Sequence, residues 1–391
     1  MAVKTNYKIN NKDYYRISAS FGRREDGKLI RKYFYGKSKK EAEQKLEEYK
    51  KSLENGIKPI KNLFLAPTMY SWLFEVVNIS NKIKPSTFER YEGLYRNYIK
   101  TSSLARVNIK DITSLQIQKY YNNLFKKENK TTSQINSVNK LLKHFFFYCI
   151  KEDYILKNPC SNIEIPGKTE YKEKEINVFN DDEIKAIVCS TEKKLIRYIA
   201  TVCVCTGLRR GECLGLKWSD LNYNTMEICV NRSVKTVGKF KDNGDKYYET
   251  IVQFPKTKNS VRTIPLPASL INTFKELKVL QSENILKAGD SYNKSNKDFI
   301  FLSADGNLID NSNLSRAWKR FLKRLNIKYI KFHALRHTYA TKQFEAGLPL
   351  KTVSVLLGHS DISVTANIYT HVMKKEKEKS IDIITSVLKM C

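Results

Sequence analysis

The sequence of 391 residues has little of what several classes of protein require. It contains no apolar run long enough to cross a bilayer, and its opening stretch, MAVKTNYKIN, lacks the apolar core of a secretory signal. None of its 8 cysteines belongs to a CxxC pair, so buried free thiols are expected in place of disulfides or zinc ligands. It also lacks an acidic cluster suited to Mg²⁺ and a phosphate-binding glycine loop that ends in Lys-Ser or Lys-Thr. We therefore expect a cytoplasmic protein with no membrane partner, whose chemistry needs no cofactor, neither a metal ion nor ATP.

Negative charge is also scarce in this chain. It has 70 Lys and Arg residues against 40 Asp and Glu residues, which gives a net charge of +30 distributed along the whole length. A surface of this kind attracts a polyanion, and with 23 tyrosines among the basic residues nucleic acid is the first candidate. A proteome that is generally rich in lysine is the alternative source of the charge. The length and the 41% of hydrophobic residues are compatible with two or three folded domains.

Residues 1–60 are expected to form a small sheet with one helix. Apolar and polar residues alternate over residues 7–36 around an Asp-Gly turn, so two or three short antiparallel strands are predicted. A helix then begins at Ser38, with Glu41 completing a capping box, and ends before Gly56. With 16 basic and 8 acidic side chains, the segment is expected to enter a DNA groove as an arm-type DNA-binding module. The alternative is a plain module whose charged face contacts only solvent.

A helical domain is expected over residues 61–165, between two linkers that are rich in proline, glycine and charge. Pro67 is expected at the first position of its first helix. The stretch LLKHFFFYCI is expected to be the most buried part of the domain. Capping residues and the spacing of apolar positions predict helices at about residues 67–79, 85–100, 113–127 and 131–152.

A third domain of mixed structure is expected over residues 175–391. Helices are predicted on both sides of a small antiparallel sheet, whose strands are MEICVN, KYYETIVQF and VRTIPL within residues 226–266. Residues 299–302, FIFL, predict one more short strand. The expected fold class is therefore multidomain α+β, with a small β-sheet plus helix as the N-terminal module, an all-α domain, and a mixed, mainly α-helical domain with a small antiparallel sheet.

Four side chains within residues 331–370 suit one phosphate group. They are His333, Arg336, His359 and Tyr369. Arginine presents a planar fork of donors to two phosphate oxygens, histidine donates or shuttles a proton near neutral pH, and the tyrosine hydroxyl can attack phosphorus. These residues by themselves predict a phosphoryl-transfer site.

Five short motifs occur in order along the third domain. They are TGLRRGE (206–212), PKTK (255–258), HALRH (333–337), LGH (357–359) and YTHV (369–372). Together they resemble the ordered motif set of tyrosine recombinases, and the three-domain plan resembles the integrases of conjugative transposons and related mobile elements. The resemblance implies a site-specific enzyme that cuts and rejoins DNA strands through a 3′-phosphotyrosine intermediate, to excise and integrate a mobile element. It also implies a core-type DNA-binding role for residues 61–165 and catalysis by residues 175–391.

In this resemblance, Tyr369 is the nucleophile that becomes joined to the DNA 3′ phosphate. Fixed positive groups must meet the charge on the equatorial phosphate oxygens, a task that suits Arg209 and Arg336, and their charge also favours the attacking phenolate. His333 and His359 are expected to hydrogen-bond the phosphate or to assist proton movement. The alternatives are a surface Arg209, a His359 that caps a helix and a Tyr369 that only packs.

The family uses a lysine on a β-hairpin to protonate the leaving 5′ oxygen. Lys256 is the expected general acid here, with Lys258 as its rival, and a solvated surface lysine is the alternative. Glu212 resembles the family's acidic residue that braces the site without reacting. Tyr369 follows His359 by ten residues, one more than in many family members, which suggests a slightly different turn before the tyrosine helix.

The expected partner is double-stranded DNA at attachment sites, on which the protein is expected to form a homotetramer. Ile381, Ile384, Val387 and Leu388 share one face of a C-terminal helix, and relatives exchange this element between subunits in a ring of four. Packing of this helix on its own domain is the alternative. The resemblance further suggests an excisionase and a host DNA-bending protein as partners, and a protein associated with the bacterial nucleoid.

Three other functions compete with this one. A housekeeping recombinase that resolves chromosome dimers has a similar site but lacks a module such as residues 1–60. A type IB topoisomerase nicks and reseals one duplex with a similar set of residues but differs in its domain plan. A DNA-binding repressor or architectural protein with an inactive catalytic domain is disfavoured by the complete set of Arg, Lys, His, Arg, His and Tyr.

Overall fold

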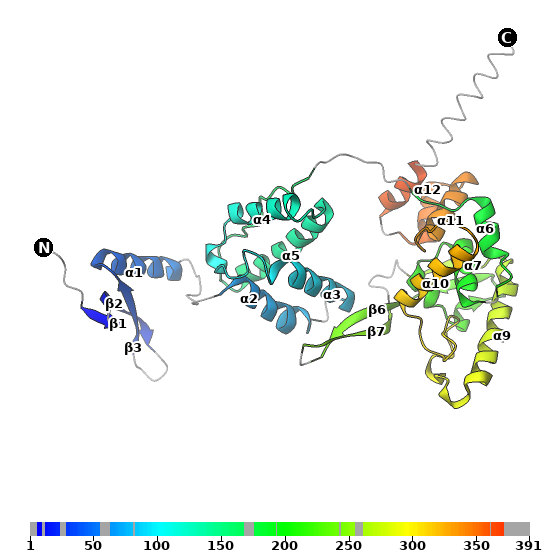
Figure 1. Cartoon of the computed structure of the whole chain (residues 1–391), viewed down its shortest axis with the longest axis horizontal. Helices are drawn as coiled ribbons and strands as arrows, with labels where there is room; N and C mark the ends of the chain where they lie inside the picture. Colours follow the sequence, from blue (N-terminus) through cyan, green and yellow to red (C-terminus); the bar gives the residue numbers. More distant parts are fainter. Residues whose placement is uncertain are drawn as a thin grey trace, which may run out of the picture. The chain divides into compact units, whose positions relative to one another are not determined.

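The chain folds into two compact units, Met1–Glu170 and Tyr171–Cys391, in a computed structural model (Figure 1). No helix in the part of the chain that the structure describes is long and apolar enough to cross a membrane. The described residues are 6–9, 12–23, 29–54, 63–80, 83–167, 176–192, 194–241, 244–254, 261–359 and 361–370.

The first unit begins with an antiparallel sheet of order β1-β2-β3, formed by Tyr7–Ile9, Lys12–Arg23 and Leu29–Gly36. Helix α1 (Lys39–Glu54) packs on β2 and β3, where Phe34 is buried and its ring centroid lies 5.4 Å from that of Tyr49 (Figure 1). The predicted strands and helix are thus confirmed. The Glu41 N–H donates to the Ser38 hydroxyl at 3.2 Å, but the Glu41 carboxylate accepts from the Lys37 N–H, so only half of the predicted capping box forms. The predicted turn and Gly56 lie outside the described residues.

The rest of the first unit is helical. Helices α4 and α5 both begin with a capping box, of which that of Thr113 with Gln116 in α4 was predicted. Helix α5 buries Leu141, Leu142, Phe145, Phe146 and Cys149 of the LLKHFFFYCI stretch. Helices α2 and α3 each continue into a π-helical turn, η1 and η2, which periodicity alone does not predict. The bounds are α2 Leu65–Ser71, η1 Trp72–Val77, α3 Pro85–Leu94, η2 Tyr95–Ile99, α4 Ser114–Lys126 and α5 Thr132–Lys151.

The start of α2 differs from the prediction. The helix begins at Leu65, so Pro67 is its third residue and not its first. The backbone N–H groups of Leu65 and Ala66 donate to the carbonyls of Val107 and Ala105, both at 3.0 Å, which satisfies donors that a first helical turn leaves open. Pro67 is still tolerated, because its missing N–H also falls within that first turn.

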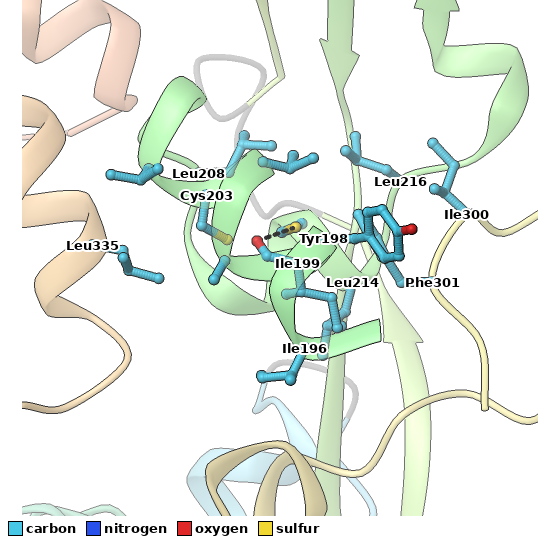
Figure 2. Packing of buried hydrophobic residues seen from close by; sticks show 14 of the residues in the cluster. Ile196, Tyr198, Ile199, Cys203, Leu208, Leu214, Leu216, Ile300, Phe301 and Leu335 are labelled. Atoms are coloured by element: carbon cyan, nitrogen blue, oxygen red, sulfur yellow. Dashed lines mark hydrogen bonds between the residues drawn. The ribbon is translucent and has the colours of Figure 1, made fainter. Parts of the chain in front are cut away.

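The second unit packs its helices around α7. Side chains from α7, from residues 208–216 and from Leu335 of α11 belong to one buried cluster (Figure 2). The cluster underlies the segment that contains the TGLRRGE motif. The helices are α6 Asp181–Val188, α7 Leu195–Thr206, α8 Arg210–Leu214, α9 Leu270–Ala288, α10 Asn311–Arg324, α11 Ala334–Glu345 and α12 Leu350–Leu357, followed by helical residues 362–370.

The predicted single sheet of the second unit is two sheets. Strands β4 (Leu221–Asn222), β5 (Glu227–Val230) and β8 (Arg262–Pro265) form one, while β6 (Ser233–Phe240) and β7 (Lys246–Gln253) form a separate two-stranded ribbon (Figure 1). Strand β6 was not predicted, although its pairing with β7 runs over its whole length. The predicted FIFL strand forms only isolated bridges, Lys217 with Phe299 and Leu302 with Leu308.

Candidate active site

Three arginine side chains meet at the C-terminal end of α12. Carbonyl groups there carry partial negative charge and have no partner within the helix, so guanidinium groups stabilise them. The bonds run from Arg262 Nε to the Leu356 oxygen (3.0 Å), from Arg336 Nη2 to that of Leu357 (2.7 Å) and from Arg209 Nη2 to that of Gly358 (2.9 Å). Gly358 has a φ of +65°, and an added Cβ would lie 2.8 Å from Arg262 Nη1. The glycine of the LGH motif is thus required both by the backbone and by the arginine beside it.

Glu212 holds two of these arginines. Its carboxylate accepts from Arg209 Nη1 at 2.8 Å, from the Arg209 backbone N–H at 3.0 Å and from Arg262 Nη2 at 2.8 Å. Burial by itself raises the pKa of the Glu212 carboxyl, but the hydrogen bond and charge of Arg262, then those of Arg209, outweigh it and lower the pKa to about 2. One ionised carboxylate therefore faces three guanidinium groups, which leaves the cluster positive and open to an anion.

Arg336 lies deepest in the cluster. Only 2% of this residue is exposed, and its Nη1 also donates to the Gly207 carbonyl at 2.9 Å. Burial, followed by the positive charge of Arg209, lowers the pKa of Arg336 to about 9, so the guanidinium is still charged at neutral pH. Gly207 ends α7 with a φ of +66°, which again places a glycine carbonyl against an arginine. Arg209 differs in that 40% of its side chain is exposed, so it is the guanidinium that an incoming anion can reach first.

Both predicted histidines lie beside the arginines. Desolvation, with the positive charge of Arg336 and Arg209, lowers the pKa of His359 to about 4. The pKa of His333 is also lowered to about 4. Desolvation is the largest cause, followed by the charge of His337 and of the same arginines. Both imidazoles are therefore neutral at pH 7, and each can donate one N–H to a phosphate oxygen.

A buried threonine orients one of these histidines. Nδ1 of His359 lies 2.7 Å from Oγ1 of Thr365, a residue that is 0% exposed. When the threonine hydroxyl donates in this bond, the imidazole proton is on Nε2. That tautomer directs an N–H donor away from Thr365.

Tyr369 lies one helical turn after Thr365. It is half-buried, and its ring packs edge-on against Phe344 of α11 with the centroids 5.2 Å apart. Among the described residues, its hydroxyl has no hydrogen-bond partner. The structure thus brings five of the predicted site residues together, namely Arg209, Glu212, His333, Arg336 and His359. Tyr369 lies on the helix that follows His359.

Two predicted candidates lie outside the described residues. Lys256 and Lys258 belong to residues 255–260, which connect β7 to β8. The predicted C-terminal helix within residues 371–391 is likewise outside the described part of the chain. Within that part, no group of three or more His, Cys, Asp or Glu side chains could hold a metal ion.

Sequence analysis missed two residues that shape this site, Arg262 and Thr365. In strand β8, Arg262 lies on the same face as the buried Ile264, because burial alternates along the strand. A charged residue at such a core position is unusual, and this was the sequence signal that could have identified Arg262 as a site residue. Thr365 has a weaker signal, since it shares a helix face with Ile368 and Tyr369 by spacing alone. Neither residue belongs to the five motifs.

A cleft of about 540 Å³ opens beside the cluster. Its walls come from α8, β6, α10 and the segment that leads into α11. Arg209 and His333 both line it, so the cleft adjoins the arginine cluster. The lining residues are Arg209, Arg210, Gly211, Val234, Lys235, Thr236, Asn311, Ser315, Trp318, Tyr329, Lys331, Phe332 and His333.

Comparison with known proteins identifies the family. Residues 177–376 match the Phage integrase family, and residues 68–125 match the Phage integrase, N-terminal SAM-like domain. The chain belongs to the phage integrase family of tyrosine recombinases. It is therefore an enzyme that cleaves and rejoins DNA strands, as the motif resemblance implied.

Other recombinases resemble the chain over most of its length. The tyrosine recombinase XerC-like protein of Caldanaerobacter subterraneus subsp. tengcongensis is 49% identical over 99% of this chain and 100% of its own. The ICEBs1 integrase of Bacillus subtilis is 24% identical over 82% of this chain and 83% of its own. The solved structure of the Tn1549 transposon integrase with a circular intermediate DNA has a TM-score of 0.61 at 20% identity, covering 80% of this chain and 98% of that one. The likeness confirms the predicted fold class.

Proposed function

We propose that this recombinase excises and integrates a mobile DNA element, and that Tyr369 is the nucleophile of strand cleavage. The arginine cluster at the end of α12 carries the proposal. Three guanidinium groups face a single carboxylate there, and Arg209 has exposed surface. A scissile phosphate supplies the negative charge that such a cluster lacks.

Each residue of the cluster has a role in this proposal. Arg209 and Arg336 bind the non-bridging phosphate oxygens. Arg336 has donors left for this, because its bonds to the Gly207 and Leu357 carbonyls use two of its five N–H groups. His333 and His359 donate from neutral imidazoles. Glu212 does not react, and it holds the guanidinium of Arg209 in place.

Cleavage then follows as an in-line exchange of oxygens on phosphorus. The Tyr369 hydroxyl loses its proton to solvent water, and its oxygen forms a bond to phosphorus while the bond to the 5′ oxygen breaks. Lys256 gives that leaving oxygen a proton, with Lys258 as the rival donor. The phosphotyrosine retains the energy of the broken bond, so a 5′ hydroxyl can reverse the exchange and rejoin a strand without ATP or a metal ion. The hydroxyl of Tyr369 has no partner among the described residues, so no hydrogen bond to any of them must break before it attacks.

The test uses a nicked duplex that spans the junction of the element next to this gene. A nick beside the cleavage position makes the strand that carries the new 5′ hydroxyl short enough to diffuse away. Without that strand the intermediate cannot be rejoined, so the covalent adduct is trapped. Wild-type protein without metal should give a protein-DNA adduct on a denaturing gel, and Tyr369→Phe should give none. An adduct that persists in Tyr369→Phe would mean that another residue is the nucleophile, and specific binding without any adduct would count against catalysis altogether.

A housekeeping role is the second candidate, because the relative with 49% identity over nearly the whole chain is described as XerC-like. The sheet and helix at residues 6–54 are the basis for preferring the mobile element, because they suit a module for a second set of DNA sites. The XerC-like relative matches this region as well, so DNA binding must decide between the roles. Footprinting separates the two roles. Protected repeats at a distance from the crossover site support the mobile-element role, and protection confined to the crossover site supports the housekeeping one.

The open face of the N-terminal sheet supports its assignment as an arm-type DNA-binding module. The Arg16 guanidinium carbon lies 4.3 Å from the centroid of the Tyr7 ring and 5.0 Å from that of Tyr33. Strand register places Arg16 opposite Tyr35, one position away from the pair of Ile17 with Phe34 that faces α1. The basic and aromatic side chains therefore gather on the face that α1 leaves open, as a surface for duplex DNA requires.

Assembly is the last part of the proposal. The protein is proposed to act on DNA as a homotetramer in which residues 375–391 dock on a neighbouring protomer, with residues 61–165 bound to the core sites. An excisionase and a host DNA-bending protein are proposed to set the direction of the reaction. The protein is proposed to act in the bacterial cytoplasm, associated with the nucleoid.

A further inference from the structure

The cleft beside the arginine cluster contains cations that the proposed cleavage step does not use. Arg210, Lys235 and Lys331 line it together with Arg209 and His333. No acidic side chain is among the residues that line the cleft. Its charge is therefore strongly positive, and three of its four Lys and Arg residues are not assigned to the scissile phosphate.

Arg210 is the most constrained of these cations. It is half-buried, and its Nη1 donates to the Ser315 hydroxyl of α10 at 3.2 Å. Burial lowers the pKa of Arg210, and the charge of Asp310 only partly opposes this. In the described part of the chain no carboxylate forms an ion pair with Arg210, so a partly desolvated cation is held in the wall with four N–H donors unassigned.

Lys235 and Lys331 add charge at the rim of the cleft. Both are exposed, Lys235 on β6 and Lys331 just before α11. Neither forms an ion pair with any residue that the structure describes. A fixed arginine provides directional hydrogen-bond donors to a phosphodiester, and the flexible lysines beside it add positive charge that attracts the DNA backbone.

Arg209 and Arg210 are consecutive residues whose side chains diverge. Arg209 reaches the end of α12 and Glu212, whereas Arg210 reaches Ser315 on α10. Their Cα atoms are only about 3.8 Å apart, so two guanidinium groups are presented to one strand from a single point of the chain. A DNA strand with one phosphate on Arg209 can therefore place a neighbouring phosphate on Arg210.

We propose that Arg210, with Lys235 and Lys331 at the rim, forms a second phosphate site that binds one of the phosphodiesters next to the scissile one. This rests on the proposed function, because it takes the scissile phosphate to lie on Arg209 and Arg336. The second site sets the position of the strand, so that phosphorus meets the tyrosine oxygen in line. Arg210 is thus a DNA-binding and positioning residue, and it takes no part in bond making.

The test removes charge from either side of the contact. Nicked duplexes carry one neutral methylphosphonate at each of the positions that flank the scissile phosphate, and the rate of adduct formation is measured in single turnover. Arg210→Ala should slow the adduct about 10- to 100-fold on unmodified DNA. At one flanking position the methylphosphonate should slow the wild type to a similar degree and have no further effect on Arg210→Ala. The slope of log binding constant against log salt concentration should also fall by about one for this variant.

Two further variants complete the experiment. Arg320→Ala removes an exposed arginine of α10, the helix that carries Ser315. Arg320 does not line the cleft, so this variant should keep the wild-type rate. Arg210→Gln removes the charge with a smaller loss of packing, and it takes the place of Arg210→Ala if that variant does not fold. If every methylphosphonate slows the Arg210 variant as much as the wild type, Arg210 binds no flanking phosphate and the proposal is wrong. If the wild type gives no adduct on unmodified DNA, the proposed function itself has failed.

Discussion

At the scale of single residues, the stability of the site depends on a buried ion pair between a motif residue, Glu212, and an arginine outside the five motifs, Arg262. Arg262 and Glu212 expose only 7% and 12% of their side chains and lie 2.8 Å apart. Arg262 also donates to the Leu356 carbonyl at the end of α12. This one arginine therefore connects β8, the TGLRRGE segment and α12, the elements that carry the anion site.

Arg262→Ala should strongly destabilise the second unit. It leaves a buried carboxylate with one partner fewer, a change that typically costs about 3–5 kcal/mol. Urea unfolding of the full chain, followed by a probe in the second unit, measures the free energy. Lys342→Ala is the matched control, since it removes partly exposed pairs with Asp181 and Glu345 and should cost less than about 1 kcal/mol. Equal losses in the two variants would contradict the structural role given to Arg262.

The Glu212 carboxyl should make stability depend on acid pH. Its pKa is lowered from 4.5 to about 2 in the folded state, so the unfolded state binds the proton first as the pH falls. The stabilisation is therefore fully present above about pH 4.5 and is lost as the pH falls towards 2, by roughly 3 kcal/mol in total. The difference in unfolding free energy between wild type and Glu212→Gln, measured from pH 7 to pH 3, should shrink below pH 4.5. A difference that is constant over this range would show that the carboxyl is not stabilised in its charged form.

Thr365→Val should lower activity without removing any residue of the motifs. It deletes the hydroxyl bonded to His359 Nδ1 and frees the imidazole to turn, which should slow adduct formation about 3- to 10-fold. Single-turnover assays on the nicked duplex measure the rate. Thr370→Val is the control, because that hydroxyl bonds only to the Ala366 carbonyl of its own helix. A wild-type rate for Thr365→Val would mean that other contacts orient His359.

At the scale of elements, the N-terminal sheet uses its two faces for different purposes. The face with Phe34 packs on α1, while the opposite face presents Arg16 between Tyr7 and Tyr33. Removing a residue of the open face should therefore affect binding more than folding. Its cation–π contacts are worth only about 0.5–1 kcal/mol each at such exposed positions.

Arg16→Ala should weaken binding to the proposed distal repeats about tenfold or more, because it removes charge and a donor from the proposed groove-facing surface. It should leave adduct formation on a short nicked core duplex unchanged, since that reaction belongs to the second unit. Mobility-shift titration on each DNA measures both effects. Lys40→Ala, an exposed lysine on α1, should change neither. Loss of binding in Lys40→Ala alone would place the DNA on the helix side of the module.

At the scale of the whole molecule, charge and assembly determine the behaviour on DNA. The net charge of +30 favours any polyanion, so specificity must come from the modules and from the geometry of several protomers. The proposed exchange of the C-terminal helix would make the assembly cooperative. The apolar stripe of that helix is its only basis in the sequence.

Ile384→Asp should weaken the proposed tetramer, because it places a charge on the apolar face that is expected to dock on a neighbour. Ser386→Asp adds the same charge on the opposite face of the expected helix and should have little effect. Analytical ultracentrifugation on core-site DNA distinguishes tetramers from smaller complexes. Full tetramers with Ile384→Asp, or with residues 375–391 deleted, would rule out the exchange.

The sequence by itself determined the fold class and the candidates for the site. Capping boxes such as that of Thr113 with Gln116 and the 3.6-residue spacing of apolar positions are local, so the bounds of α4 and α5 were predicted to within one residue. The site candidates were predictable because their chemistry requires particular residue types in a particular order. Arg336 and His359 belong to such motifs, and the structure brings them to the end of one helix.

Only the tertiary structure decided what depends on contacts between distant segments. Strand β6, SVKTVGKF, contains Gly238 and two lysines, residue types that are depleted in strands, and its pairing with β7 over its whole length is what makes it a strand. The apolar FIFL stretch had the composition of a strand, yet it has no partner over its length and forms bridges only. Arg262 and Thr365 were missed for the same reason, because a residue that acts through another is recognised only once folding has brought the two together.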